Sequence, residues 1–205
     1  MQSKLNKFMF FIVGNIIAAC GIILCLNSNL GIDPLSTFYS GVANLTKFNF
    51  GYAAFLVNMG LLLICLLFDK RSIKIGTILC NFIFPYFLNY WGDILSGLSQ
   101  YNVHYTLLLS TGILLTGIGF SFTIFSDLGP SCIDLLLTIL VKKSGMKIKT
   151  VKIFLDFTFT LLGLMLGAKI GIGTVLCVAL IGVIYETTIN ILNRVSFVKL
   201  KSCGE

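Results

Sequence analysis

The sequence is poor in the residues that most catalytic and metal sites require. It has a single histidine, His104, and only eight acidic residues in 205 positions. Its seven cysteines show no C-x-x-C spacing, and most lie in apolar runs, where cysteine behaves as a small buried hydrophobe. No nucleophile–base pair and no set of metal ligands can be assembled from these residues. We therefore expect no enzyme activity, metal or cofactor.

Charged residues are scarce as well. They make up 11% of the chain, whereas soluble domains carry about 25%. Hydrophobic residues make up 57%, and the mean hydropathy is +0.97. The net charge of +7 is not gathered on one soluble face, so we expect no nucleic-acid partner. The composition predicts an integral membrane protein that forms one transmembrane domain over residues 1–205, with the lipid bilayer as its main partner.

One stretch of the sequence occurs twice. Residues 28–34, SNLGIDP, return 98 positions later as residues 126–132, SDLGPSC. Further matches, at an offset of 98 or of 97 after one deletion, pair Gly14 with Gly112, Gly21 with Gly119, Asn58 with Asp156, Gly76-Thr77 with Gly173-Thr174, and Asn89 with Glu186. Matches at both ends and in the middle of such a window indicate an internal duplication.

Six apolar runs are long enough to cross a bilayer at about 1.5 Å per residue. They cover residues 7–27, 52–68, 74–95, 104–125, 150–168 and 171–193. Three belong to repeat one (7–96) and three to repeat two (104–194). Because three crossings is an odd number, the second copy must enter the membrane from the opposite side. The predicted fold is therefore an all-α membrane protein of six transmembrane helices, arranged as two inverted-topology repeats.

The distribution of basic residues supports this topology. With a cytoplasmic N-terminus, the cytoplasmic segments hold Lys4, Lys7, Lys70, Arg71, Lys74, Lys142, Lys143, Lys147, Lys149, Lys152, Arg194, Lys199 and Lys201. Only Lys47 and Lys169 fall on the outside. This asymmetry follows the positive-inside rule. We expect a multi-pass protein of the cytoplasmic membrane with both termini in the cytoplasm.

Each copy of the repeated stretch precedes a segment too short for an ordinary crossing, at residues 35–46 and 131–145. Gly31 and Gly129 can break a helix, and Pro34 and Pro130 suit the first turn of the next one. These residues predict an interrupted or re-entrant element, whose free N–H groups could face a polar ligand. An amphipathic helix lying at the membrane interface is the other reading, and the sequence favours neither.

Ionisable and amide side chains inside apolar runs are the candidates for binding a substrate or a proton. Those expected near the inner face are Asp134, Asp156 and Glu186. Those expected near the outer face are Asp33, Asn58 and Asn89. Glu186 is the first candidate, because burial would raise its pKa and allow it to carry a coupling proton. Asp156 has a second reading, as the partner of Lys152 one helical turn earlier.

Small residues form another group. Gly163, Gly167 and Gly171 recur every four residues, a spacing typical of close helix packing. Gly173 and Thr174 begin the last apolar run and could either pack against another helix or approach a substrate. The sequence leaves this choice open.

Three motifs resemble those of the YitT/YczE family of bacterial multi-pass membrane proteins. They are Gly31-x-Asp33-Pro34, Gly171-x-Gly173-Thr174 and the segment from Gly129 to Asp134. The resemblance extends from the first span to about residue 193 and is closest to the short, membrane-only YczE type. It implies a multi-pass membrane protein with a transport role, and it supplies no catalytic residues.

Together these observations predict a small secondary transporter or channel for an unidentified small solute, with proton coupling through the intramembrane carboxylates. A non-transporting scaffold or accessory protein, acting on another membrane or biosynthetic system, is the alternative. Six spans in 205 residues leave little room for a substrate cavity, so a homodimer is compatible with either reading.

Overall fold

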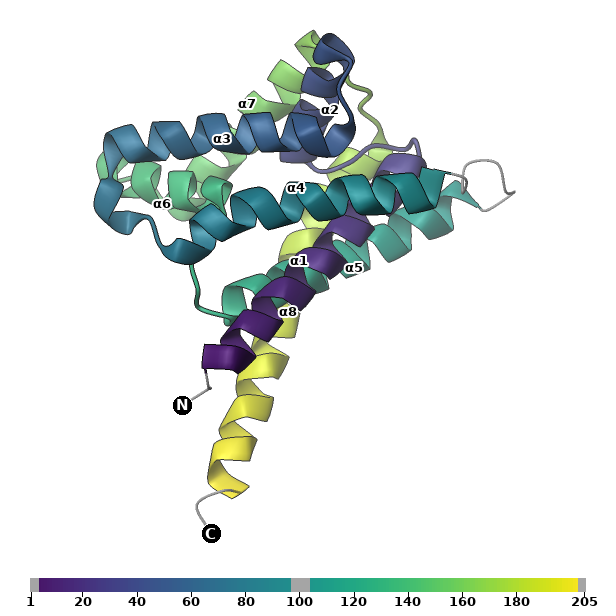
Figure 1. The fold of residues 1–205 in the computed structure, drawn as a ribbon. Coiled ribbons are helices and arrows are strands. Elements are labelled where there is room, and N and C mark those ends of the chain that lie inside the picture. Colours follow the sequence, from purple (N-terminus) through teal and green to yellow (C-terminus); the bar gives the residue numbers. More distant parts are fainter. Residues whose placement is uncertain (1–3, 97–103, 203–205) are drawn as a thin grey trace.

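The computed structural model describes residues 4–96 and 104–202, and the regular structure in these ranges is helical throughout (Figure 1). The all-α prediction is therefore confirmed. The elements are α1 (Lys4–Asn27), α2 (Pro34–Thr46), α3 (Phe50–Phe68), the 3₁₀ turn η1 (Lys70–Ser72), α4 (Ile75–Leu95), α5 (Tyr105–Phe125), α6 (Cys132–Ser144), α7 (Ile148–Met165) and α8 (Ile172–Ser202).

Four of these helices are long and apolar enough to cross a membrane. They are α1, α3, α5 and α8, with candidate spans at Leu5–Asn27, Phe50–Phe68, Tyr105–Phe125 and Ile172–Arg194. The other two predicted spans also form helices, but α7 contains three charged residues, and amides such as Asn81 and Asn89 lower the hydropathy of α4. The helix limits lie within three residues of the predicted ones, except that α8 continues to Ser202.

Helices α1 and α5 form the centre of the structure and run antiparallel (Figure 1). Gly14 packs against Gly119, and Gly21 packs against Gly112. A Cβ atom on Gly21 would lie 2.6 Å from the carbonyl oxygen of Gly112, closer than real Cβ contacts allow. Glycine at these four positions therefore lets the two backbones touch, as small residues do in membrane helix pairs.

The helices divide into a central group, α1, α4, α5 and α8, and a peripheral group, α2, α3, α6 and α7 (Figure 1). In the peripheral group, α2 packs along α7 and α3 packs along α6. Gly163 on α7 faces the backbone of Thr37, and the rings of Phe38 and Phe159 lie 5.7 Å apart. Leu61 and Leu135 belong to the apolar core between α3 and α6. Because α2 also contacts α3 and α6 also contacts α7, the four peripheral helices form one unit.

The two groups are joined unevenly. Helix α4 packs against α1 and also against α3, and so links the groups. Helix α8, which occupies the corresponding place in the second half of the chain, packs against α5. In the described part of the chain, α8 is not packed against α7. As a result, only 6% of the candidate span in α8 is buried, compared with 39–50% for the other three.

Candidate functional site

The chain between α1 and α2 leaves the helical conformation under the control of local hydrogen bonds. The Ser28 hydroxyl donates to the Cys25 carbonyl at 2.6 Å and accepts from the Leu30 N–H at 3.3 Å. Asn29 has φ 54° and Gly31 has φ 116°. The second value lies in a region that side-chain-bearing residues rarely adopt, which explains the glycine at position 31.

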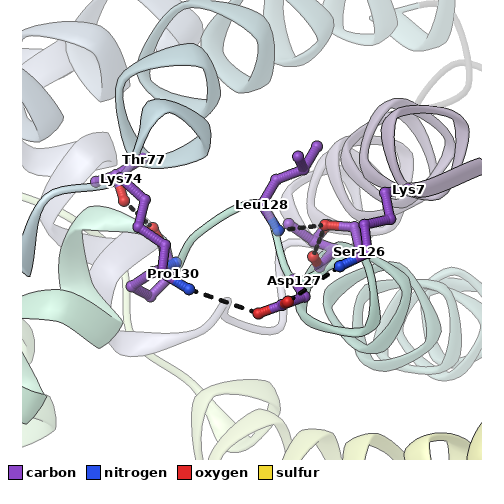
Figure 2. A network of polar contacts seen from close by, with 8 residues as sticks. Lys7, Lys74, Thr77, Ser126, Asp127, Leu128 and Pro130 are labelled. Atoms are coloured by element: carbon purple, nitrogen blue, oxygen red, sulfur yellow. Dashed lines mark hydrogen bonds and ion pairs between the residues drawn. The ribbon is translucent and has the colours of Figure 1, made fainter. Parts of the chain in front are cut away.

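The segment between α5 and α6 repeats this geometry (Figure 2). The Ser126 hydroxyl donates to the Thr123 carbonyl at 2.5 Å and accepts from the Leu128 N–H at 3.4 Å. Asp127 has φ 54° and Gly129 has φ 148°. Each feature lies 98 residues after its equivalent in the first segment. We call residues 28–33 and 126–131 the broken segments.

Asp127 attaches the second broken segment to the surface of the central group (Figure 2). Its carboxylate accepts hydrogen bonds from Lys7 at 3.1 Å and from Lys74 at 3.5 Å. These two ammonium groups hold the pKa of Asp127 below its usual range. The carboxylate is exposed, so solvent screening keeps the contribution of these ion pairs to stability small.

Each broken segment docks on the start of the last helix of the other half. The Gly173 N–H at the start of α8 donates to the Leu30 carbonyl at 2.8 Å. The Gly76 N–H at the start of α4 donates to the Leu128 carbonyl at 3.2 Å. A Cβ atom on Gly31 would lie 2.8 Å from the backbone nitrogen of Thr174. Gly173 and Thr174 therefore make packing contacts with the first segment.

One hydrogen bond distinguishes the two docking contacts. The Thr77 hydroxyl donates to the Pro130 carbonyl at 2.7 Å (Figure 2). The equivalent hydroxyl, on Thr174, is buried and has no partner among the described residues. The carbonyl that would correspond to Pro130 is that of Ile32, and it accepts from the Thr37 hydroxyl at 3.3 Å instead. The first segment is therefore held to α8 by one hydrogen bond fewer.

The short helices α2 and α6 each begin with an aspartate and a serine three residues apart, in opposite order along the chain. At α2, the N-cap is Asp33, whose carboxylate accepts from the Ser36 N–H at 3.1 Å, and Pro34 occupies the first turn. At α6, the N-cap is Ser131, which accepts from the Asp134 N–H at 3.4 Å and donates to its carboxylate at 2.6 Å. Both arrangements satisfy free N–H groups and place one negative charge at the positive end of the helix.

The structure groups three acidic residues differently from the prediction. Lys152 pairs with Asp156 at 3.5 Å, which confirms the ion-pair reading of Asp156. The Lys152 ammonium also acts electrostatically on both Asp33 and Asp134, and Asp33 acts on Asp156. Asp33 therefore lies within electrostatic range of Lys152 and Asp156, although the sequence predicted it near the opposite face of the membrane. It also lies within electrostatic range of Tyr39, the hydrogen-bond partner of Asn58.

The carboxyl groups of Asp33 and Asp134, which lie outside the candidate spans, have perturbed titration. Burial raises the pKa of both, because the charged form loses solvation. The cap hydrogen bonds and the Lys152 charge lower the pKa in part, without cancelling the effect of burial. Each group can therefore change its protonation at a higher pH than a surface carboxylate.

Three interior hydrogen bonds join polar side chains that are buried between helices. They connect Tyr39 with Asn58 at 2.7 Å, Cys80 with Asn15 at 3.3 Å, and Cys132 with Asn81 at 3.5 Å. Tyr39 also lies within electrostatic range of Asp33, Cys80 and Cys132, so this interior network borders the first broken segment. Asn58 was a predicted candidate. Asn15 and Asn81 were missed, although amides inside apolar runs are a recognisable signal.

The remaining predicted candidates lie elsewhere. The Asn89 side chain accepts from the Gly51 N–H at 3.0 Å and so joins α4 to α3. Glu186 is exposed on α8. The prediction that Glu186 is buried is wrong for this structure, because α8 does not pack against the helix that carries Asp156.

The regularly spaced glycines mostly serve packing. A Cβ atom on Gly163 would lie 2.7 Å from the Thr37 carbonyl oxygen, and Gly171 lies against the Leu30 carbonyl. Gly167 has φ 82° and open space around it, which identifies it as a helix-ending residue. The packing interpretation of this group therefore holds for Gly163 and Gly171.

The surface carries shallow hollows with mostly apolar walls. One is lined by Ile12, Phe82, Ile83, Tyr86 and Phe87, an apolar set that suits a lipid acyl chain better than a polar solute. Within residues 4–96 and 104–202, no group of three or more histidine, cysteine or acidic side chains is arranged to hold a metal ion.

Comparison with known proteins identifies relatives of this chain. It is 26% identical over 184 residues to the uncharacterized membrane protein YczE of Bacillus subtilis (strain 168), covering 89% of this chain and 85% of the relative. It is 29% identical over 171 residues to an uncharacterized protein of Haemophilus influenzae, covering 83% and 78%. It is 27% identical over 192 residues to the uncharacterized protein YyaS of Bacillus subtilis, covering 92% and 94%.

These relatives confirm the resemblance to YczE-type membrane proteins. No solved structure matches the chain significantly. A family of unknown function, DUF6198, matches residues 5–190. This range includes both broken segments and the four candidate spans, apart from the last turn of the span in α8. The chain therefore belongs to the DUF6198 family.

Proposed function

We propose that this protein is a small secondary transporter or channel of the cytoplasmic membrane, built from two inverted-topology repeats of three spans each. The observation that carries the proposal is the pair of broken segments, which share one backbone geometry and dock reciprocally on the start of α8 and of α4. Paired interruptions of this kind line the solute and ion sites of transporters made from inverted repeats.

The packing of α1 on α5 supports an inverted relation between the repeats. Gly14 corresponds to Gly112, and Gly21 corresponds to Gly119. Exchanging the repeats therefore converts the contact between Gly14 and Gly119 into the contact between Gly112 and Gly21. Two equivalent antiparallel helices are related by a two-fold axis perpendicular to them. For helices that cross a membrane, such an axis lies in the membrane plane.

Helices α4 and α7 complete the six proposed crossings. They have 21 and 18 residues, and so about 31 Å and 27 Å of helix. Two of their polar residues are buried or paired: Asn81 on α4 is 1% exposed, and Asp156 on α7 is half-buried beside Lys152. Polar groups within spans are expected to face the protein interior or to pair with one another.

The proposed topology predicts which residues can be labelled from outside the cell. Cysteines introduced as Lys47→Cys and Lys169→Cys should react with a membrane-impermeant thiol reagent in intact cells. Lys142→Cys should react only after the membrane is permeabilised. The physical reason is the retention of basic segments in the cytoplasm. Labelling of Lys142→Cys in intact cells would overturn the six-span arrangement.

Asp33 and Asp134 are the carboxylates that we propose to bind the coupling proton. Both lie at the start of a short helix, and burial raises the pKa of both above the ordinary value, as is common for groups that exchange protons at functional sites. Glu186 is exposed in this structure and lacks that burial. We therefore transfer the proton-binding role from Glu186 to Asp33 and Asp134.

The test is uptake by the purified protein in liposomes. Amino acids, vitamins and sulfur compounds are offered as solutes under an imposed pH gradient, with internal pH followed by a trapped dye. We expect one class to enter together with protons. Asp33→Asn and Asp134→Asn should each reduce proton movement at least ten-fold, since one titratable site is lost. Asparagine is an equally good N-cap at position 33, and at position 134 its side-chain oxygen can still accept the hydrogen bond from Ser131, so both variants should fold normally.

Asp127→Asn provides the matched control. It removes a carboxylate from the equivalent loop, but from an exposed position held by Lys7 and Lys74, so uptake should be unchanged. If no solute class moves and no proton movement accompanies any of them, the transport proposal fails. The scaffold reading would then take its place.

A further inference from the structure

The two halves of the chain are packed differently, and the largest difference is at one pair of faces. In the first half, α3 lies on α4. The rings of Phe55 and Phe82 are 5.5 Å apart, and the Gly51 N–H donates to Asn89 at 3.0 Å. In the described part of the second half, the equivalent helices α7 and α8 are not packed together: α7 lies beside α2, and most of α8 extends away from it (Figure 1).

Six residues equivalent to residues of the α3–α4 contact are exposed on α7 and α8. At an offset of 98, the α3 residues Gly51, Phe55 and Met59 correspond to Lys149, Ile153 and Phe157 on α7. At an offset of 97, the α4 residues Asn89, Phe82 and Asn81 correspond to Glu186, Ala179 and Val178 on α8. On α7 these residues are spaced four apart and form one helix face. The two exposed faces are therefore the counterparts of two faces that are packed together in the other half.

We infer that the protein has a second conformation, in which α7 packs on α8 as α3 now packs on α4, and in which Lys149 and Glu186 form an ion pair that closes the cytoplasmic side. This inference rests on the proposed function. Exchange of the repeats maps the peripheral group onto itself and the central group onto itself. A swing of the peripheral group would thus break the α3–α4 contact and form the α7–α8 contact, which is alternating access.

The chemistry of the two pairs fits this role. In the first half, the contact is a hydrogen bond from the Gly51 backbone N–H to the Asn89 side-chain amide, and glycine at position 51 permits the close approach. In the second half, the same two positions carry an ammonium and a carboxylate, which attract over a longer distance than a neutral hydrogen bond. Glu186 lies within the candidate span of α8, where a charge without a partner is costly. The pairing gives this charge a partner.

Cysteine cross-linking tests the inference without any knowledge of the solute. The full-length protein carrying Ile153→Cys and Ala179→Cys, with Cys203→Ser to remove one background thiol, is treated in membranes with a short bifunctional thiol reagent. We expect an intramolecular product that depends on both cysteines. The Phe55→Cys/Phe82→Cys pair, which joins faces already in contact, serves as the positive control and should cross-link in high yield.

Two further measurements distinguish alternation from random collision. Linking Phe55→Cys to Phe82→Cys first should reduce cross-linking of Ile153→Cys with Ala179→Cys several-fold, because the two contacts exclude each other. Glu186→Gln should reduce the same cross-link about two- to five-fold, as expected for one ion pair. The exchange Lys149→Glu with Glu186→Lys should restore it.

Each other outcome contradicts the inference. Absence of the α7–α8 product while the control pair links means that the two faces do not meet. A product that migrates as a dimer means that α8 faces a second copy of the chain. Equal yields before and after linking α3 to α4 mean that the contacts are independent. Failure of solute uptake affects none of these readings, so the proposed function and this conformational change can fail separately.

Discussion

Replacing Gly119 by alanine should destabilise the protein by about 1–3 kcal/mol, and replacing it by leucine should prevent stable folding. A Cβ atom at this position would meet the backbone of Ala18 and would lie 2.7 Å from the Gly14 carbonyl oxygen. The obstacles are backbone atoms on a straight helix, which cannot rotate away as a side chain can. The α1–α5 pair would have to separate along its length, and the small-residue contact at Gly21 and Gly112 would be lost with it.

Thermal unfolding in detergent, followed by the loss of a monodisperse peak, measures this effect. Gly60→Ala is the matched control, since Gly60 also lies within a candidate span and has open space where a Cβ would be. Alanine is the better helix former, so Gly60→Ala should be neutral or slightly stabilising. Equal melting temperatures for Gly119→Ala and Gly60→Ala would contradict the close packing of α1 and α5.

Replacing Gly31 by alanine should have the second large effect. Gly31 has φ 116°, where an alanine is strained by about 1–3 kcal/mol, and its Cβ would lie 2.5 Å from the Thr174 hydroxyl and 2.8 Å from the Thr174 nitrogen. The first broken segment would be forced off the start of α8. We expect a lower melting temperature together with loss of uptake, because the adjoining Asp33 cap would move.

Two variants separate the causes of this effect. Gly145→Ala places a Cβ at another positive φ, 67°, but in open space, so it should cost only about 1 kcal/mol. Adding Thr174→Ala to Gly31→Ala removes the hydroxyl clash but leaves the backbone strain, so rescue should be partial. Full rescue would show that the φ value at Gly31 is unimportant, and absence of any rescue would show that the Thr174 hydroxyl is not the obstacle.

Much of the fold could be predicted because its determinants are local. Gly31 and Gly129 indicate turns whose backbone conformation only glycine adopts readily, and their 98-residue spacing predicted two equivalent breaks in the helices. The Asp156–Lys152 pair follows from helical spacing alone. Hydropathy located the helices to within a few residues, although four rather than six are apolar enough to count as spans by length and composition.

The positions of Glu186 and Asp33 could not be predicted, because they depend on how whole helices are packed. Equivalent sequence predicts equivalent packing, and by that rule α8 should lie on α7 as α4 lies on α3. The structure departs from the rule, so Glu186 is exposed while its counterpart Asn89 is engaged. Asp33 lies near Lys152 and Asp156 because α2 packs along α7, a long-range contact that no local pattern reveals.

The glycine contact between α1 and α5 also bears on how the chain is made. Gly14 meets Gly119, a residue synthesised 105 positions later. At about 5–20 residues per second, α1 waits about 5–20 s in the bilayer before its partner emerges from the ribosome. During that interval its small-residue face is open to other helices. Neither half of the gene product can bury this face by itself, so insertion of the second half completes the fold of the first.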